Sequence, residues 1–210
     1  MIDIFVINLK HRKNRLDLFN FYFSKHFNIN VTDAIKDKEG WKGCLNSHLK
    51  CIQYAKDNNL KYIIVFEDDA APLNGGCEKL KKIAEEVFEK KNNWDIYLGG
   101  SIRIYQKSKI KKYDLKNDIF RIHAAKSTYC IVYNHTCYDF FLNCDKKKPI
   151  DTLWHKKINC IASIPYLFTC SNTKSDISGT WQQLNRMIEN DEKINLEYIK
   201  TIKENENEDV

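Results

Sequence analysis

Residues 62–72 read YIIVFEDDAAP, and this stretch constrains the fold more than any other part of the chain. Five apolar or aromatic residues in a row predict a strand that is buried on both faces, as the strands of a parallel sheet are. Glu67, Asp68 and Asp69 follow directly at its carboxyl end. Because ligands of open α/β sheets bind at the carboxyl ends of strands, the stretch predicts an α/β fold with an acidic site at one sheet edge.

Strand-like and helix-like segments alternate through the first hundred residues. The expected strands are residues 3–9, 28–35, 61–69 and 93–100. The expected helices are residues 12–27, 42–58 and 77–91. This order predicts a mainly parallel central sheet flanked by helices. With 210 residues, the chain is expected to form one domain over residues 1–200, and the acidic tail over 201–210 is expected to be disordered.

The charge balance favours an anionic ligand. Thirty-four Lys and Arg against 28 Asp and Glu give a net charge of +6. The basic residues are mostly lysine, whereas base readout in nucleic acids more often uses arginine, so stable nucleic-acid binding is not expected. Contact with an anionic membrane surface stays open, and nothing in the sequence indicates an oligomeric state.

The cysteines and the apolar runs bear on location. No stretch approaches the roughly 18–20 apolar residues of a membrane span, and the first residues do not resemble a signal peptide. We therefore expect a cytoplasmic protein, in the host cytoplasm if the gene is viral, with its eight cysteines reduced. No CxxC pair occurs, which argues against a closed structural zinc site.

The three acidic residues are candidate metal ligands. Side chains alternate along a strand, so Glu67 and Asp69 share one side while Asp68 faces the other. Two carboxylates on one side repel each other unless a cation lies between them, and Mg²⁺ or Mn²⁺ prefers such oxygen ligands. The alternative is that these acids are solvated or cap the next turn.

Basic residues follow the first strand in the segment NLKHRKNR, which contains Arg12 and Arg15. The start of a helix favours anions, so this segment is a candidate phosphate site, with a solvated helix face as the alternative. Neither GxGxxG nor GxxxxGK occurs, and this disfavours the common dinucleotide and ATP folds.

Two further segments carry candidate functional groups. In GWKGCLNSHLKC, Cys44, His48 and Cys51 fall at i, i+4 and i+7 on one helix face. They favour a stripe facing the core with one hydrogen-bonded histidine over a zinc site, because no fourth ligand is evident. Asp151 follows a proline in KPIDTLWHKK, where local sequence favours a helix N-cap.

Six segments, in chain order, resemble glycosyltransferase family 25. They are VINLKHRKNR, GWKGCLNSHLKCIQYA, YIIVFEDDAAP, WDIYLGG, AAKSTYCIVYN and PIDTLW. The resemblance covers residues 2–180, and its most specific parts are the GxxGCxxSH pattern and the apolar segment that ends in EDD. It implies a GT-A-like fold, a UDP-galactose or UDP-glucose donor, and Mn²⁺ or Mg²⁺ as the cofactor.

The resemblance also assigns roles to residues. It aligns Glu67, Asp68 and Asp69 with the family's metal-binding motif, so we predict that Asp69 binds the metal and that Glu67 or Asp68 helps with the metal or the ribose. We predict Asp151, in the aligned PID segment, as the base of an inverting reaction, with a metal-ligand or sugar-orienting role as the alternative. The residues that the resemblance places near the nucleotide sugar are Asn8, Leu9, Arg12, Arg15, Ser47, His48, Asp68 and Asp176.

The expected activity is therefore transfer of a hexose from a UDP-sugar to a hydroxyl group of a glycan or protein acceptor. One alternative is a protein that binds nucleotide sugars or nucleic acid without catalysis. Another is a different Mg²⁺-dependent phosphoryl enzyme, although such enzymes gather acids from several strand ends, and the first strand here ends in Asn8–Leu9–Lys10.

Overall fold

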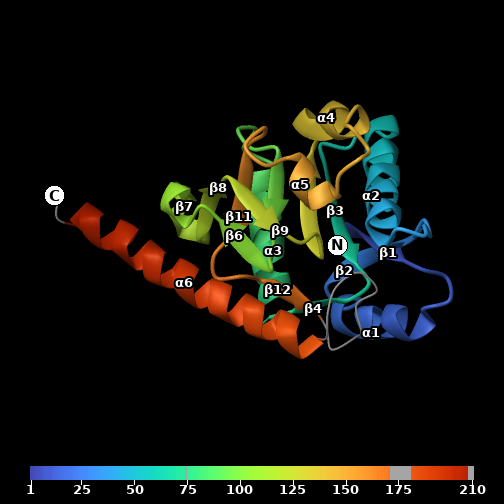
Figure 1. Cartoon of the computed structure of the whole chain (residues 1–210), viewed down its shortest axis with the longest axis horizontal. Coiled ribbons are helices and arrows are strands. Elements are labelled where there is room, and N and C mark those ends of the chain that lie inside the picture. The colour runs from blue at the N-terminus through green and yellow to red at the C-terminus, as the bar shows by residue number, and fades with distance from the viewer. Residues whose placement is uncertain (74, 171–180, 208–210) are drawn as a thin grey trace.

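The computed structural model describes residues 1–73, 75–170 and 181–207. Within these residues, eight strands form a central sheet in the order β2-β1-β3-β10-β5-β11-β8-β7 (Figure 1). Its strands are β1 (Ile2–Asn8), β2 (Phe27–Asp33), β3 (Tyr62–Glu67), β5 (Ile96–Leu98), β7 (Lys111–Asp114), β8 (Ile119–Ile122), β10 (Cys130–Asn134) and β11 (Cys160–Ser163). Two short ribbons pair β4 (Ala70–Pro72) with β12 (Phe168–Cys170), and β6 (Arg103–Tyr105) with β9 (Ala124–Lys126).

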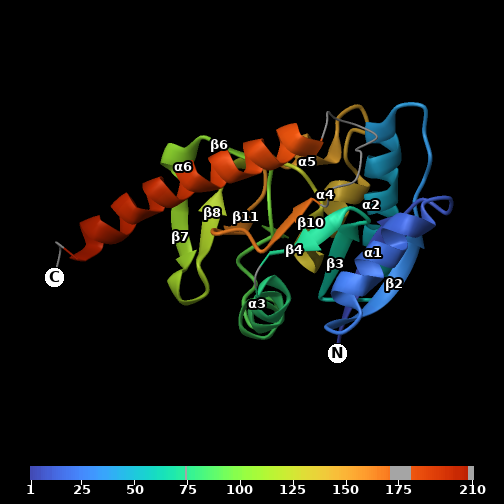
Figure 2. The same ribbon diagram turned by 90° about the horizontal axis from the view of Figure 1, so that it is seen from below.

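Helices flank this sheet. They are α1 (Lys13–Phe23), α2 (Gly40–Asp57), α3 (Gly76–Ile83), α4 (Tyr138–Leu142), α5 (Ile150–Leu153) and α6 (Trp181–Asn207). A π-helical turn (Ala84–Phe88) continues α3, and 3₁₀ turns occupy Lys107–Lys109, Leu115–Asn117 and His135–Cys137. Helices α3 and α6 lie on opposite sides of the strands, and the end of α6 extends past β7 (Figure 2). No helix in this described part of the chain combines the length and apolarity that crossing a bilayer requires.

The α/β class is confirmed, but the expectation of a mainly parallel sheet is wrong. Strand β1 is parallel to β2 and β3, and β5 is parallel to β11. Strand β10 is antiparallel to both β3 and β5, and β8 is antiparallel to β11 and β7. The reason is the connection before β10: the chain makes the β6–β9 excursion instead of a helical crossover, and so enters the sheet from its other end.

The first helix and the second strand have different bounds from those expected. The helix predicted over residues 12–27 ends at Phe23, because Phe27 already pairs with Ile2 as the first residue of β2. The tail expected to be disordered from residue 201 coincides with the end of α6 as far as Asn207, and residues 208–210 lie outside the described part.

Aromatic packing fixes α1 against the central strand. Phe19 and Phe23 stack with ring centroids 4.2 Å apart, and the ring centroids of Phe23 and Phe66 of β3 are 5.0 Å apart. Residues 63–66 of β3 are at most 1% exposed, as the uninterrupted apolar run predicted. The strand ends at Glu67, which pairs with Ile7 near the carboxyl end of β1. The acidic turn therefore begins beside the residues that lead into α1.

A glycine allows β12 to close over the end of β5. A Cβ atom on Gly100 would lie 2.2 Å from the carbonyl oxygen of Phe168, which no side chain tolerates. Strand β12 pairs with β4, and β4 begins at Ala70, directly after the acidic turn. The close approach at Gly100 therefore brings the β12–β4 ribbon next to this turn. The turn that carries the three carboxyl groups is thus held between the end of β3 and a second pair of strands.

Candidate functional site

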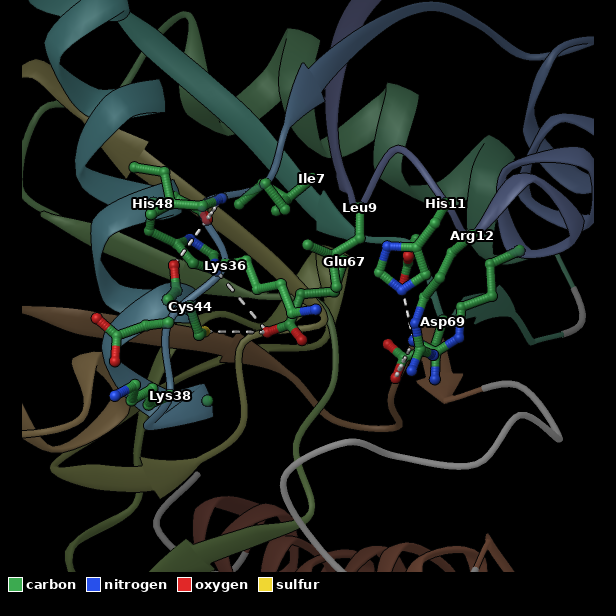
Figure 3. A pocket seen from close by; sticks show the side chains of 18 residues that line it. Ile7, Leu9, His11, Arg12, Lys36, Lys38, Cys44, His48, Glu67 and Asp69 are labelled. Atoms are coloured by element: carbon green, nitrogen blue, oxygen red, sulfur yellow. Dashed lines mark hydrogen bonds and ion pairs between the residues drawn. The ribbon is translucent and has the colours of Figure 1, made fainter.

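A cavity of about 360 Å³ opens at the carboxyl ends of β1 and β3. Its lining comes from three regions of the chain: the segment after β1, the loop from β2 to α2 with the start of α2, and the acidic turn (Figure 3). In this view Glu67 lies between Cys44 on one side and Asp69 on the other. The acidic residues that the sequence singled out therefore face a cavity and not open solvent.

Asp68 is held by protein donors. The Asn8 side chain donates to its Oδ2 at 2.8 Å, and Arg15 Nη1 donates to its Oδ1 at 2.7 Å. Asp68 and Arg15 are both buried. Burial raises the pKa of Asp68, while Arg15 and Asn8 oppose that shift. This arrangement ties the end of β1 and helix α1 to the acidic turn, so in this structure the three side chains brace the site.

Asp69 and Glu67 both face the cavity, but the pKa of Asp69 is raised and the pKa of Glu67 is lowered. Burial, together with the neighbouring Glu67, raises the pKa of Asp69 to about 7, although Arg15 lies 3.6 Å from its Oδ2 and opposes the rise. Burial acts in the same direction on Glu67, but contacts with His48 and Thr128 outweigh it and lower the pKa of Glu67. A cation beside Asp69 would relieve the crowding of negative charge that raises its pKa.

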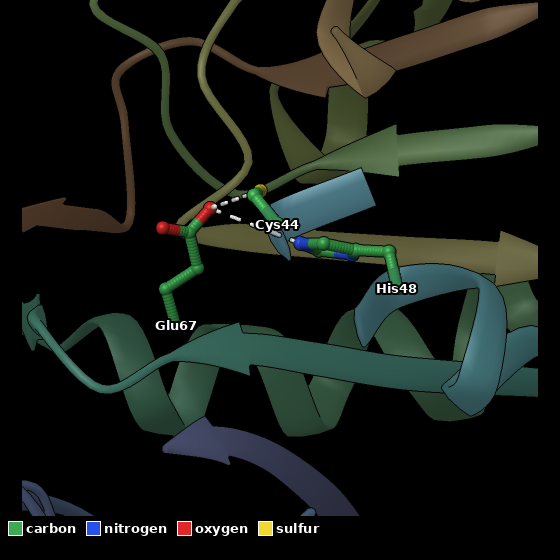
Figure 4. Close-up of side chains that lie close together, drawn as sticks. All are labelled: Cys44, His48 and Glu67. Atoms are coloured by element: carbon green, nitrogen blue, oxygen red, sulfur yellow. Dashed lines mark hydrogen bonds and ion pairs between the residues drawn. The ribbon is translucent and has the colours of Figure 1, made fainter. Parts of the chain in front are cut away.

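His48, on α2, lies next to Glu67 at the start of the acidic turn (Figure 4). His48 is completely buried, and its Nδ1 lies 3.0 Å from the hydroxyl group of Tyr133. Its Nε2 lies 3.8 Å from Oε1 of Glu67, and Cys44 Sγ lies 3.9 Å from the same oxygen. Thr128 also donates a hydrogen bond to Oε1 of Glu67.

The expected stripe facing the core, with one hydrogen-bonded histidine, is confirmed for His48 and Cys51, whereas Cys44 is half-buried beside Glu67. Cys51 turns to Thr32, whose hydroxyl oxygen lies 3.8 Å from its sulphur, and is buried in the core. The third member of the cluster is Glu67, which comes from β3. Residues along one helix face can therefore contact different elements: Cys44 and His48 lie near Glu67 of β3, whereas Cys51 lies near Thr32 of β2.

Ser47 connects α2 to the loop in front of it. Its hydroxyl donates to the Gly43 carbonyl at 2.7 Å and accepts from the Ile35 amide at 2.8 Å. A Cβ atom on Gly43 would lie 2.5 Å from the Ile35 carbonyl oxygen, so the loop packs directly on the helix backbone. Ser47 is buried and shapes the cavity wall through this loop.

Arg12 and Leu9 lie where β1 turns into α1. The Arg12 amide donates to the Leu9 carbonyl at 2.7 Å, which closes the turn, and both residues line the cavity. Asp176, the remaining residue expected near the donor, lies outside the described residues.

A second cavity of about 450 Å³ adjoins the first at the acidic turn. It shares Cys44, Glu67 and Asp69 with the first cavity and adds Asp151. The Ser127 amide donates to Oδ2 of Asp151 at 3.3 Å, and burial raises the pKa of this carboxyl group. The N-cap interpretation of Asp151 is wrong, because Pro149 occupies that position and Asp151 lies inside α5.

Sequence reasoning missed several cavity residues. His11, Lys36 and Lys38 line the first cavity, and Thr128 and Tyr133 contact Glu67 and His48. The two lysines lie in the segment DAIKDKEG, which runs directly into the helix motif GWKG. That proximity is the feature of the sequence that could have identified them as cavity residues. Thr128 and Tyr133 come from the loop before β10 and from β10 itself, and nothing in the local sequence links them to α2.

The family model described as glycosyltransferase family 25 (LPS biosynthesis protein) matches residues 38–153, more than half of the chain. That range includes α2, the acidic turn and Asp151. No curated protein sequence matches the chain.

Solved structures share the fold at low sequence identity. A glycosyltransferase involved in the glycosylation of the major capsid of PBCV-1 is 10% identical, with a TM-score of 0.51, 89% of this chain covered and 98% of that chain covered. The inositol-1-phosphate CTP transferase from T. maritima is 11% identical, with a TM-score of 0.48, 91% of this chain covered and 77% of that chain covered. The capsid glycosyltransferase is similar to the chain in fold alone, and that fold is GT-A-like.

Proposed function

This chain belongs to glycosyltransferase family 25, and from that premise we propose that it transfers a hexose from a UDP-sugar to a hydroxyl group of a glycan or protein acceptor. The observation that carries the proposal is the position of the acidic turn, whose Glu67 and Asp69 line both cavities. A transferase needs such an arrangement, because donor and acceptor must meet at one point while each is held by its own surface.

The first cavity would bind the UDP part of the donor. Arg12, His11, Lys36 and Lys38 line it and can offset the charge of a diphosphate. Helix α1 begins beside this cavity, and the amide groups at a helix start favour an anion. Arg15 is engaged with Asp68 and would act by fixing the turn.

Asp69 and Glu67 fit a divalent cation. Both offer carboxylate oxygens at the cavity wall, where burial and the neighbouring Glu67 raise the pKa of Asp69, and divalent cations prefer such oxygen ligands. We propose Mn²⁺ or Mg²⁺ here, with Asp69 as a direct ligand. Such an ion would stabilise the charge that develops on the leaving diphosphate.

The second cavity would bind the acceptor. Asp151 lies on its wall, where burial raises the pKa of its carboxyl group, and a carboxylate at this position could take a proton from an acceptor hydroxyl. Trp41, Tyr105 and His155 supply flat apolar or aromatic surface around it, which suits a sugar ring. In this scheme Asp151 is the base, and the anomeric configuration inverts.

The metal assignment is tested by UDP-sugar hydrolysis with purified protein, with and without Mn²⁺. The wild type should hydrolyse the donor only with the metal, and Asp69→Ala should not respond to it. Asp17→Asn, an exposed acidic position on α1, serves as the control and should behave like the wild type. Equal metal-dependent turnover by the wild type and Asp69→Ala would overturn the assignment.

The base assignment needs a separate measurement. Asp151→Asn should bind UDP-sugar with unchanged affinity and lose about 10²–10⁴-fold in transfer rate, the usual contribution of a general base. Full transfer by this variant would remove Asp151 from the mechanism and leave the donor site untouched.

A further inference from the structure

We infer that Cys44, His48 and Glu67 form a zinc-binding site, separate from the Mn²⁺ or Mg²⁺ site proposed at Asp69. The inference goes beyond the proposed transfer reaction and does not depend on it. The three residues come from two elements, since Cys44 and His48 are one turn apart on α2 and Glu67 ends β3 (Figure 4).

The spacing of the three ligand atoms suits a tetrahedral ion. Cys44 Sγ, His48 Nε2 and a Glu67 carboxylate oxygen all lie within 4.8 Å of one another, and the two distances to Oε1 are 3.8 and 3.9 Å. With zinc bond lengths of about 2.1 Å to nitrogen or oxygen and 2.3 Å to sulphur, tetrahedral ligands stand about 3.4–3.6 Å apart. The two pairs that include Oε1 exceed this spacing by a few tenths of an ångström, and the third pair, Cys44 Sγ and His48 Nε2, would have to close from at most 4.8 Å.

The imidazole of His48 gives the second, independent indication. Its Nε2 is fully buried and has no hydrogen-bond partner among the described residues, although it points at Glu67. A buried polar atom without a partner is costly, and 3.8 Å is too long for a hydrogen bond to Oε1. A cation between the two atoms would give Nε2 the partner that it lacks.

The other ring nitrogen is already oriented. His48 Nδ1 lies 3.0 Å from the Tyr133 hydroxyl group, and donating a proton to that oxygen leaves the lone pair of Nε2 free for a metal. Histidine ligands of zinc commonly use their second nitrogen in this way, which fixes the tautomer and the ring plane.

The donor set selects the metal. A thiolate and an imidazole favour zinc over Mg²⁺ or Mn²⁺, which prefer oxygen. Binding takes the proton from the Cys44 thiol and forms a sulphur–zinc bond, so affinity rises with pH. One Glu67 oxygen faces this cluster while the other points away from it, which leaves the second oxygen for the cation at Asp69 (Figure 4).

Cobalt reports on the site directly, because Co²⁺ bound to a thiolate absorbs in the near ultraviolet. The probe is Co²⁺ added to the full-length, reduced, metal-free chain. The wild type should develop this band to one equivalent, and Zn²⁺ should abolish it. Cys44→Ser should lose the band, whereas Cys51→Ser, a buried cysteine two turns along the same helix, should keep it.

Two further variants separate ligation from general damage to the fold. Tyr133→Phe removes only the hydroxyl group that orients His48 and should weaken Co²⁺ binding by about 10–100-fold. Asp69→Asn should keep the band, because Asp69 belongs to the other cation site. A chain that shows the band but has no Mn²⁺-dependent hydrolysis would support the zinc site and refute the proposed function.

The inference is overturned by a wild type that shows no band, or by a band that survives in Cys44→Ser. It is also overturned if Cys51→Ser loses the band while its urea unfolding curve matches that of the wild type. Hydrolysis that requires Mn²⁺ in a chain without the cobalt band would leave the proposed function standing alone.

Discussion

At the scale of single residues, Asp68 and Asp69 have opposite surroundings although they are neighbours in the chain. Asp68 turns inward to Arg15 and Asn8, and Asp69 turns to the cavity beside Glu67. Asp68 is thus held by two close donors, whereas Asp69 has Arg15 only at 3.6 Å and lies next to Glu67. We therefore expect substitution of Asp68 to lower the free energy of unfolding and substitution of Asp69 to raise it.

Asp68→Ala should destabilise the fold. It removes the acceptor of a buried arginine, and breaking such a pair on one side costs about 3–5 kcal/mol, less here because Arg15 also lies near Asp69. Urea unfolding gives the free energy of unfolding of the variant and the wild type. A difference below about 0.5 kcal/mol, the range of ordinary surface substitutions, would contradict the bracing role.

Asp69→Asn should stabilise the metal-free protein at neutral and alkaline pH. The pKa of Asp69 is about 7 in the folded protein, against about 3.9 for an unfolded chain. The folded state therefore binds this proton more tightly, so the contribution of Asp69 to stability is present below about pH 4 and is lost as pH rises towards 7. A pKa that differs by one pH unit between the folded and unfolded states corresponds to about 1.4 kcal/mol of stability.

The measurement is urea unfolding in EDTA at pH 5 and pH 8. The gain in stability of Asp69→Asn over the wild type should be larger at pH 8 than at pH 5. An equal gain at both values would mean that Asp69 ionises normally in the folded protein.

Glu67 and Asp69 line the same two cavities, as predicted, although β3 ends at Glu67 and Asp69 lies in the turn that follows, beyond the reach of strand alternation. The partner of Cys44 and His48 could not be found from the sequence. Glu67 reaches them because α2 packs across the end of β3, and spacing along the helix had indicated Cys51 instead. Contacts between elements depend on packing that one sequence does not display.

At the scale of elements, the start of α2 determines the wall of the first cavity. Gly43 lets the Ile35 carbonyl approach the helix, and the Ser47 hydroxyl bridges the same loop to the helix backbone. The loop that carries Lys36 and Lys38 therefore takes its position from two small residues on α2.

Gly43→Ala should displace this loop. The added Cβ would lie 2.5 Å from a backbone oxygen, and a forced fit of this kind costs about 1–3 kcal/mol. We expect a lower free energy of unfolding together with weaker UDP binding by calorimetry. Gln53→Ala, at an exposed position of the same helix, should change neither quantity. Unchanged UDP affinity in a destabilised Gly43→Ala would separate the loop from donor binding.

The elements themselves were largely predictable, whereas the direction of one strand was not. Strands β1, β3 and β5 and helix α2 lie where hydrophobic patterns placed them, with ends that differ by a few residues. Strand β10 is buried along its whole length, so it has the same pattern in either direction. Only the path of the preceding excursion decides that it runs antiparallel to both neighbours.

At the scale of the whole molecule, one buried carboxylate anchors α6 to the rest of the fold. Asp191 Oδ2 accepts from the Ile104 amide at 2.9 Å, from the Tyr166 hydroxyl at 2.8 Å and from the Asn195 side chain at 2.9 Å. Lys107 pairs with its other oxygen. The connection joins α6 to β6 and to the segment that leads into β12.

Asp191→Ala should loosen α6 without unfolding the sheet. Each buried donor left without an acceptor costs about 1–3 kcal/mol, and about 1.4 kcal/mol already changes an opening equilibrium tenfold. Hydrogen exchange of the α6 amides around Ile188 and Ile199 should therefore accelerate at least tenfold, while β3 amides stay protected. Glu189→Ala, an exposed position on α6, is the control. Equal exchange in both variants would show that the apolar face alone holds the helix.

The common wall of the two cavities, made by Cys44, Glu67 and Asp69, has a consequence for how they fill. A molecule bound in one cavity contacts side chains that also form the surface of the other, so the two binding free energies are not independent. Thermodynamic linkage then requires reciprocity: whatever factor one occupant applies to the affinity of the second, the second applies to the first.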